Sequence, residues 1–311
     1  MNPRAEAFER LSGAYDVRVL EPSPPAVNRP PWFADDPTAR GVVPPGRQVV
    51  SPVTTGDLLW DDLAGSDREL ADWCAERWLG CLRRLERVPS GLTDTRRSLH
   101  ALARRVIGPV RERANEHSGL RWTRGGFGTP FFGADAQVRI DGGELVVDAG
   151  DEERRVALTT IRDAAEAIGF DLSGVDEPHA ATPLEIDTTA SYFVSDWFGF
   201  VTSVLEQLRA EARPEWQPSR VQIWPEHFDA AVELGNEQAG QRAGCGGSPG
   251  DDTHPEPYLY VTPWSARPEG ELWGARDFVG AELGYAELLA APDQRAAALE
   301  FFRVRLAALA A

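Results

Sequence analysis

Apolar residues at three- and four-residue steps predict several amphipathic helices along the 311-residue chain. The first follows Ser66, whose spacing to Glu69 is that of a capping box. Its apolar stripe consists of Leu70, Trp73, Cys74, Trp78, Cys81, Leu82 and Leu85. A second helix, which should end or kink at Gly108–Pro109, carries a stripe of Leu99, Leu102, Ala103, Val106 and Ile107. Together they form an N-terminal helical pair.

Further helices are predicted in the second half of the chain. Thr159 or Thr160 can cap a short helix that stops at Gly169. A longer helix runs from Ala190 to Arg209. Its helically spaced apolar positions indicate a buried stripe rather than a cofactor site: Phe193, Trp197, Phe200, Val201, Val204 and Leu208. Helical segments over 277–290 and 293–309 complete the set.

Between these helices the period of the pattern changes to two, which predicts strands. Residues 137–140 and 144–147 flank Asp141-Gly142-Gly143 as a hairpin, because glycine supplies the positive φ of the turn. Other strands are expected over 154–158, 219–223, 228–234 and 257–262. Short antiparallel strands with packed helices, and no repeated βαβ unit, predict an α+β fold.

Proline content divides the chain into three regions. Residues 1–55 form a Pro-rich arm, in which fixed φ and missing N–H donors disfavour helices and central strands. Residues 56–117 form a helical region, and residues 118–311 form the α+β body. Trp32 suggests that the arm packs on the body, and a loosely ordered tail is the alternative.

Charge and composition exclude several function classes. A net charge of −17 disfavours binding to nucleic acid or to an anionic membrane surface. The 32 lysine and arginine residues are all arginine, so the chain lacks the lysine that pyridoxal phosphate and Walker-type nucleotide sites use. No apolar run approaches the roughly 20 residues of a membrane span, and the first residues lack a secretory signal. We therefore expect a cytoplasmic protein.

The candidate catalytic residues are His227, Asp229, His254 and Glu256. Each histidine precedes a carboxylate by two positions, and residues two apart on a strand share a face. Imidazole and carboxylate together suit a zinc- or iron-type site, or a general base oriented by an acid. The identity of any metal or cofactor is left open. The alternative is a structural hydrogen bond between partly buried polar groups, and Pro225, Pro255 and Pro257 interrupt the strands.

Two weaker motifs carry less information. Gly125-Gly126-Phe127-Gly128 is followed by a strand pattern rather than a helix, so it predicts a tight turn and not a phosphate loop. Cys245 lies in the glycine-rich segment 235–252, which we interpret as a flexible loop or a long hairpin connection. A Cys245 nucleophile with His254 as its base is a further alternative. The three cysteines show no CxxC spacing, which argues against a thiolate zinc site.

Three stretches resemble an uncharacterised bacterial family built on a domain of unknown function. These are an aromatic-led segment ending in Phe-Asp (Trp224 to Val232), a Pro-Gly loop leading to Pro-Glu-Pro and alternating aromatics (Ser248 to Tyr260), and the C-terminal Leu283 to Phe302. The resemblance covers roughly residues 97–311. It implies a common fold unit and supplies no activity. His227 departs from the small residue that family members carry before Phe-Asp.

Two functions remain open at this point. The first is a small-molecule-binding protein or enzyme with an aromatic-lined pocket beneath the 235–252 loop. The second is a non-catalytic interaction or structural module, for which a protein partner is not identified. An enzyme needs His, Asp and Glu to converge in a concave site, whereas an interaction module needs a broad exposed apolar patch.

Overall fold

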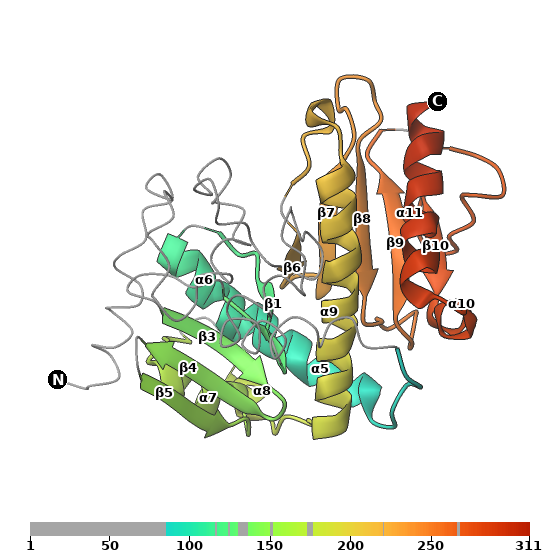
Figure 1. Cartoon of the computed structure of the whole chain (residues 1–311). Helices are drawn as coiled ribbons and strands as arrows, with labels where there is room; N and C mark the ends of the chain where they lie inside the picture. The colour runs from blue at the N-terminus through green and yellow to red at the C-terminus, as the bar shows by residue number, and fades with distance from the viewer. Residues whose placement is uncertain are drawn as a thin grey trace, which may run out of the picture.

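The computed structural model describes residues 85–115, 117–123, 125–129, 136–149, 152–172, 177–219, 221–265 and 268–311. The predictions for the Pro-rich arm, the Ser66 capping box, and the stripe containing Cys74 and Cys81 lie outside these residues. Within them the fold is α+β, as the sequence predicts, with two antiparallel five-stranded sheets (Figure 1).

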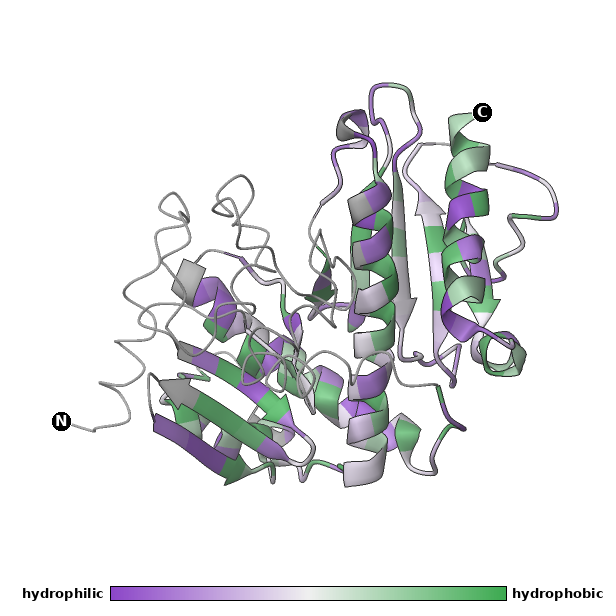
Figure 2. Ribbon diagram, in the orientation of Figure 1, coloured by the Kyte–Doolittle hydropathy of each residue, from purple (hydrophilic) through white to green (hydrophobic). Residues whose placement is uncertain are grey.

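The N-terminal sheet has the strand order β1-β2-β3-β4-β5, and each strand pairs with the next in sequence. Its strands are β1 (Arg121–Thr123), β2 (Gly126–Gly128), β3 (Ala136–Asp141), β4 (Glu144–Ala149) and β5 (Glu152–Ala157). The expected hairpin is confirmed: β3 and β4 pair from Ala136↔Ala149 to Asp141↔Glu144, and Gly142 has φ 61° in the turn. In Figure 2 the edge strand β5 is largely hydrophilic, whereas β4 beside it is hydrophobic along most of its length.

The C-terminal sheet has the order β10-β9-β8-β7-β6. Its strands are β6 (Gln222–Trp224), β7 (Asp229–Leu234), β8 (Ala243–Ser248), β9 (Tyr258–Pro263) and β10 (Ala281–Gly284). An isolated bridge between Leu120 and Ile223 connects the two sheets beside β1 and β6.

The long helix α9 (Thr188–Glu211) packs on both sheets and is the central element of the fold (Figure 1). Asp187 caps it by accepting a hydrogen bond from the Ala190 amide. The Trp122 indole donates to the Ser195 carbonyl at 2.9 Å, which fixes the N-terminal sheet to the helix. The predicted stripe is buried apart from Phe193, which is partly buried, and Trp197 has 0% exposure. Therefore α9 carries one core that serves both sheets.

The second predicted helix continues past Gly108–Pro109, where the sequence predicts an end or a kink. It consists of α5 (Leu92–Leu102), a π-helical turn η4 (Ala103–Ile107) and α6 (Gly108–Asn115). In the π turn the Gly108 amide bonds to the Ala103 carbonyl, five residues back. A wider turn makes room for the Pro109 ring, which in a regular helix would meet the carbonyl four residues earlier. The helix thus passes through Pro109.

Shorter helices complete the described residues: α7 (Ile161–Ile168), α8 (Glu177–Ala181), the 3-10 turn η5 (Pro214–Trp216), α10 (Tyr285–Ala290) and α11 (Gln294–Ala310). The α7 prediction is confirmed, because Thr160 accepts a hydrogen bond from the Asp163 amide and Gly169 ends the helix with φ 67°. Local capping chemistry was sufficient to define this helix.

Two C-terminal segments differ from the prediction. The segment expected as a loop over 235–252 contains strand β8, and the helix expected over 277–290 begins only at Tyr285, after β10. In β8 the glycines permit close packing on both faces. A Cβ built on Gly247 would lie 2.6 Å from Val201 of α9, and one on Gly246 would lie 2.4 Å from the Tyr260 ring. Glycine here marks close approach rather than flexibility.

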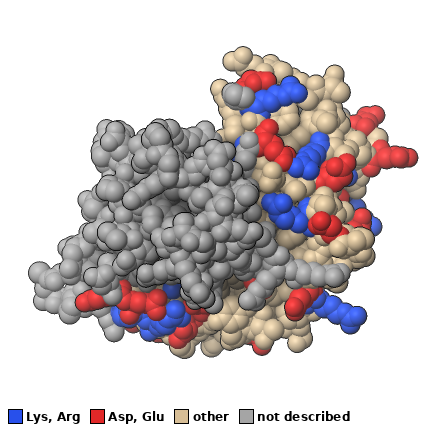
Figure 3. Space-filling view, in the orientation of Figure 1, with Lys and Arg blue, Asp and Glu red and all other residues tan. Residues whose placement is uncertain are grey.

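Acidic and basic side chains are interspersed over the C-terminal half on the face shown in Figure 3. Arg303 of α11, for example, donates to Glu211 of α9 at 3.0 Å. Among the described residues, no helix combines the length and apolar character required to cross a membrane.

Candidate functional site

Strand alternation gives the C-terminal sheet two chemically different faces. The inner face packs on α9 and is apolar, with Val232, Cys245 and Val261 all buried. The opposite face, here called the outer face, carries Asp229 of β7, Tyr258 and Tyr260 of β9, and Glu282 of β10. Tyr260 pairs with Gly246 of β8 on one side and with Glu282 of β10 on the other. The side chains of Tyr260 and Glu282 are therefore direct neighbours across the two strands.

The turn between β6 and β7 positions Asp229. Phe228 has φ 55°, a left-handed conformation that is uncommon for a bulky residue, and its amide bonds to the Trp224 carbonyl at 2.7 Å. Its ring is buried and stacks on His100 of α5, with ring centroids 5.3 Å apart. Phe127 also packs against it edge-on at 5.2 Å. Tertiary packing therefore holds a strained backbone immediately before Asp229.

Asp229 is a buried carboxylate whose hydrogen bonding is incomplete. It is 7% exposed, and the Tyr260 hydroxyl donates to its Oδ2 atom. Its Oδ1 atom has no hydrogen-bond partner among the described residues. Burial raises the pKa of Asp229, and the Tyr260 hydrogen bond and His227 oppose that shift. The absence of a side chain at Gly246 lets the Tyr260 ring cross β8 to reach Asp229.

Asp251 organises the loop between β8 and β9. Its Oδ1 atom accepts hydrogen bonds from the Thr253 amide, the Thr253 hydroxyl and the His254 amide at 2.7, 2.7 and 2.8 Å. Its Oδ2 atom accepts from the Tyr258 hydroxyl at 2.8 Å. Burial opposes ionisation, but these hydrogen bonds prevail and lower the pKa of Asp251. The loop thus has an ionised carboxylate at its centre.

His254 lies among carboxylates from three segments. Its Nδ1 atom is 3.3 Å from the Asp251 carboxylate. Its Nε2 atom is 3.3 Å from Glu282 Oε2 and 3.5 Å from Asp277 Oδ2. The ring packs on Tyr258, with centroids 4.4 Å apart. The histidine therefore joins the loop to β10 and to the connection that precedes it.

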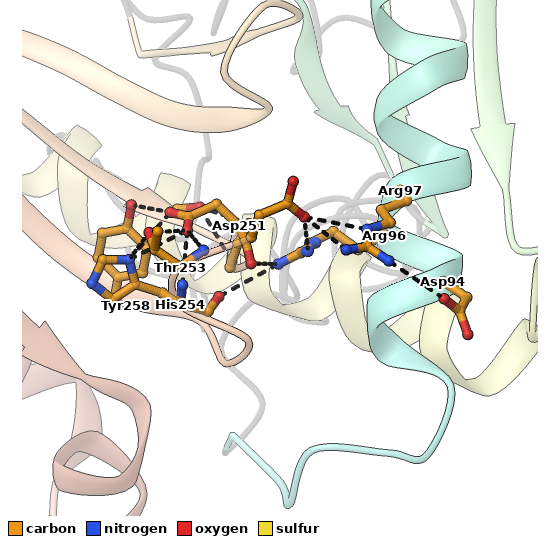
Figure 4. Close-up of polar contacts among 10 residues, drawn as sticks. Asp94, Arg96, Arg97, Asp251, Thr253, His254 and Tyr258 are labelled. Carbon is orange, nitrogen blue, oxygen red and sulfur yellow. Dashed lines mark hydrogen bonds and ion pairs between the residues drawn. The ribbon is translucent and has the colours of Figure 1, made fainter. Parts of the chain in front are cut away.

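Arg96 links the β8–β9 loop to helix α5 (Figure 4). Its guanidinium donates to the Asp251 carbonyl at 2.7 Å and lies 3.7 Å from the Asp252 carboxylate. Arg97 pairs with Asp252 at 2.9 Å. Burial lowers the pKa of Arg96, while Asp251 and Asp252 act in the opposite direction. Arg96 is 4% exposed, so its hydrogen bond to the Asp251 carbonyl is a buried link, whereas the pair between Arg97 and Asp252 lies at the surface, with side chains 60% and 80% exposed.

The four predicted residues occupy two neighbouring parts of this region. Asp229 begins β7, and His227 lies in the turn before it. His254 and Glu256 both lie in the β8–β9 loop, where strand alternation does not position them. The structure joins Asp229 to Tyr260 and His254 to Asp251. No hydrogen bond joins His227 to Asp229 or His254 to Glu256 in the structure.

Sequence reasoning missed five residues of the site: Arg96, Asp251, Tyr258, Tyr260 and Glu282. The alternation Tyr258-Leu259-Tyr260 was a usable signal, because it places both tyrosines on one face of a strand. Arg96 carried no such signal, since its partner Asp251 is 155 positions away.

The metal and nucleophile alternatives find no geometric support. Among the described residues, no group of three or more His, Cys, Asp and Glu side chains is arranged to hold a metal ion. Cys245 is buried on the inner face, where burial raises its pKa, while His254 lies in the loop beside the outer face. Of the Gly125-Gly126-Phe127-Gly128 motif, predicted as a tight turn, only Gly125 lies in a turn, with φ 82°, and Gly126–Gly128 form strand β2.

Comparison of the chain with models of protein families, with curated proteins and with solved structures found no match. The outer face must therefore be interpreted from its own chemistry.

Proposed function

We propose that the protein is a cytoplasmic small-molecule-binding protein that holds its ligand on the outer face of the C-terminal sheet, at Asp229 and Tyr260. The carrying observation is the unpartnered Oδ1 atom of Asp229, in a residue that is 7% exposed. Burial of a carboxylate without full hydrogen bonding is unfavourable, and native proteins satisfy most such groups. A ligand that donates to Oδ1 would remove this penalty.

The surroundings of Asp229 support binding. The strained Phe228 backbone precedes it, and such strain tends to occur at functional sites. Tyr258 and Tyr260 supply aromatic surface, with ring centroids 6.2 Å apart, and Phe278 meets Tyr260 edge-on at 6.3 Å. In this proposal these rings take the role of the aromatic lining that is expected from the sequence near 235–252.

A second candidate function is a protein-interaction module. Among the described residues, the exposed large apolar side chains include Trp264, Leu272 and Val279, which are 51%, 36% and 50% exposed. All three belong to the connection between β9 and β10. An exposed apolar patch is typical of a contact surface, and this candidate assigns that role to the connection. This candidate predicts partner binding that Trp264→Ala and Val279→Ser weaken and that Asp229→Asn leaves unchanged.

Thermal-shift screening of a small-molecule collection against wild-type protein and Asp229→Asn tests the first proposal. Asparagine keeps the shape of the side chain and can still accept from Tyr260. Compounds should raise the melting temperature of the wild type and not of Asp229→Asn, because only a binder of the folded state stabilises it. Glu237→Gln, an exposed substitution in the β7–β8 turn, is the matched control. Equal shifts in wild type and Asp229→Asn would reject this site.

A further inference from the structure

We propose that the ligand held at Asp229 and Tyr260 carries a protonated primary amine, whose ammonium group donates a hydrogen bond to Asp229 Oδ1 and lies against the Tyr260 ring. This inference rests on the proposed function and adds the chemical class of the ligand.

Hydrogen-bond complementarity is the first argument. The Tyr260 hydroxyl already serves Asp229 Oδ2, so Oδ1 is the remaining acceptor. An ammonium group has three donors and no acceptor, and therefore it can satisfy a carboxylate oxygen without adding an unpaired atom of its own. Hydrogen bonds between ionised partners are also stronger than neutral ones.

The charge around the outer face is the second argument. Carboxylates approach it from separate elements: Asp229, Asp251, Asp277 and Glu282. His254 contacts three of these carboxylates, and Arg96 is engaged on the α5 side of the loop. Within the part of the chain that the structure describes, no arginine contacts Asp229 or Glu282. The nearby basic group that acts on Asp229 is His227. The other carboxylates gather around His254, whereas Asp229, when ionised, is left for a cation to balance.

Aromatic surface is the third argument. Tyr260 lies over Gly246, where no side chain intervenes. A cation within about 6 Å of a tyrosine ring is attracted by the ring quadrupole. Gly284, which pairs with Tyr258 at the end of β10, has open space around the position that its Cβ would occupy. The outer face therefore leaves room for an organic substituent beside Tyr258.

Binding of an ammonium group should be linked to proton release. Burial raises the pKa of Asp229 in the free protein, and a cation beside it would lower that pKa. The ionisable groups that interact with it are Tyr258 and Tyr260 of β9 and His227 of the turn. The affinity for the amine should then increase with pH, up to the pH at which Asp229 is already ionised in the free protein. A neutral ligand would show no such release.

Isothermal titration with n-butylamine, n-butanol and tetramethylammonium tests this inference on the full chain. The amine should bind. n-Butanol should bind more weakly because it has no charge, and tetramethylammonium should bind more weakly because it has no N–H donor. Asp229→Asn should weaken amine binding by about tenfold or more, as expected for loss of a charged hydrogen bond. Glu237→Gln, which changes an exposed acid in the β7–β8 turn, should bind as the wild type does. Titrations in buffers of different ionisation enthalpy report the released proton.

A second measurement guards against misfolding of the variant. The carboxyl ¹³C signal of Asp229, followed in wild-type protein, should shift to the ionised position when n-butylamine is added. Equal binding of amine and alcohol, or an Asp229 signal unaffected by the amine, would overturn the inference. If neutral compounds from the screen bind the wild type and not Asp229→Asn, the proposed function stands and the amine assignment fails. If nothing binds at Asp229, both fail.

Discussion

Both sheets are antiparallel and pair each strand with the next in sequence, but their carboxylates differ in whether an arginine neutralises them. In the N-terminal sheet Arg155 is 3.0 Å from Asp141, 3.1 Å from Glu144 and 2.7 Å from Glu153. Arg139 lies 3.2 Å from Glu153 and 3.4 Å from Asp141. These side chains remain partly solvated. Asp141, Glu144 and Glu153 each have an arginine partner, so these three carboxylates need no ligand to balance them.

The C-terminal sheet instead buries Asp229 and supports it with one tyrosine. No arginine of the described residues neutralises it, although arginine is the basic residue of the whole chain. The comparison shows that charge on a sheet face does not by itself indicate function. The two faces differ because the C-terminal sheet has a buried carboxylate, Asp229, with an oxygen that lacks a hydrogen-bond partner among the described residues. The following predictions test that difference.

Trp197→Ala should have the largest effect, because it removes the core on which the C-terminal sheet depends. Trp197 is fully buried and packs on Phe200 and Tyr285 at 6.0 and 5.7 Å between ring centroids. Truncation of a buried tryptophan costs about 3–5 kcal/mol, measurable by urea unfolding. Val279→Ala, at a half-exposed position, is the control. A loss under about 1 kcal/mol, the scale of surface changes, would contradict this position for Trp197.

Gly246→Ala should have the next largest effect and should act on the outer face alone. A Cβ there would lie 2.4 Å from the Tyr260 ring and 2.8 Å from the Ala230 carbonyl. Forcing atoms into a filled space costs about 1–3 kcal/mol, and the displaced Tyr260 would release Asp229. Gly284→Ala on the same face meets nothing within 4 Å and is the matched control. Equal stability of both variants would show that Tyr260 does not occupy this position.

Asp229 and Asp251 should have opposite effects on the pH dependence of stability. The pKa of Asp229 is raised above the ordinary value of 3.8, so its folded form binds more protons and stability falls as pH rises from about 4. The pKa of Asp251 is lowered, so it stabilises the fold above about pH 4 and that contribution is lost on acidification.

Unfolding of Asp229→Asn and Asp251→Asn across pH measures this contrast. Relative to wild type, Asp229→Asn should gain stability as pH rises, whereas Asp251→Asn should lose it. Parallel pH profiles for the two variants would mean that the two carboxylates have similar environments.

Local sequence signals predicted the fold better than they predicted the site. Thr160 and Gly169 define α7 through hydrogen bonds within a few residues, and the β3–β4 hairpin follows from its glycine turn. Gly246 was misinterpreted, because its role depends on Tyr260 arriving from another strand.

The site depends on contacts between distant segments. Asp229 was identified from sequence, but its partner Tyr260 is 31 positions away. Phe228 adopts a conformation that its own preference disfavours, and rings from α5, β2 and α9 stabilise it there. Such tertiary effects leave no local period or motif in the sequence.

The smallest effect is expected at the N-terminal sheet, where Arg155→Gln removes ion pairs to three carboxylates. Its side chain is 38% exposed and its partners are 20–46% exposed, so water can replace the lost contacts. Exposed ion pairs contribute about 0–1 kcal/mol, and salt screening reduces them further. Urea unfolding at low and high salt should show a small loss at low salt that narrows at high salt. A loss as large as that of Gly246→Ala would mean that this network is as important to stability as the close packing of the outer face.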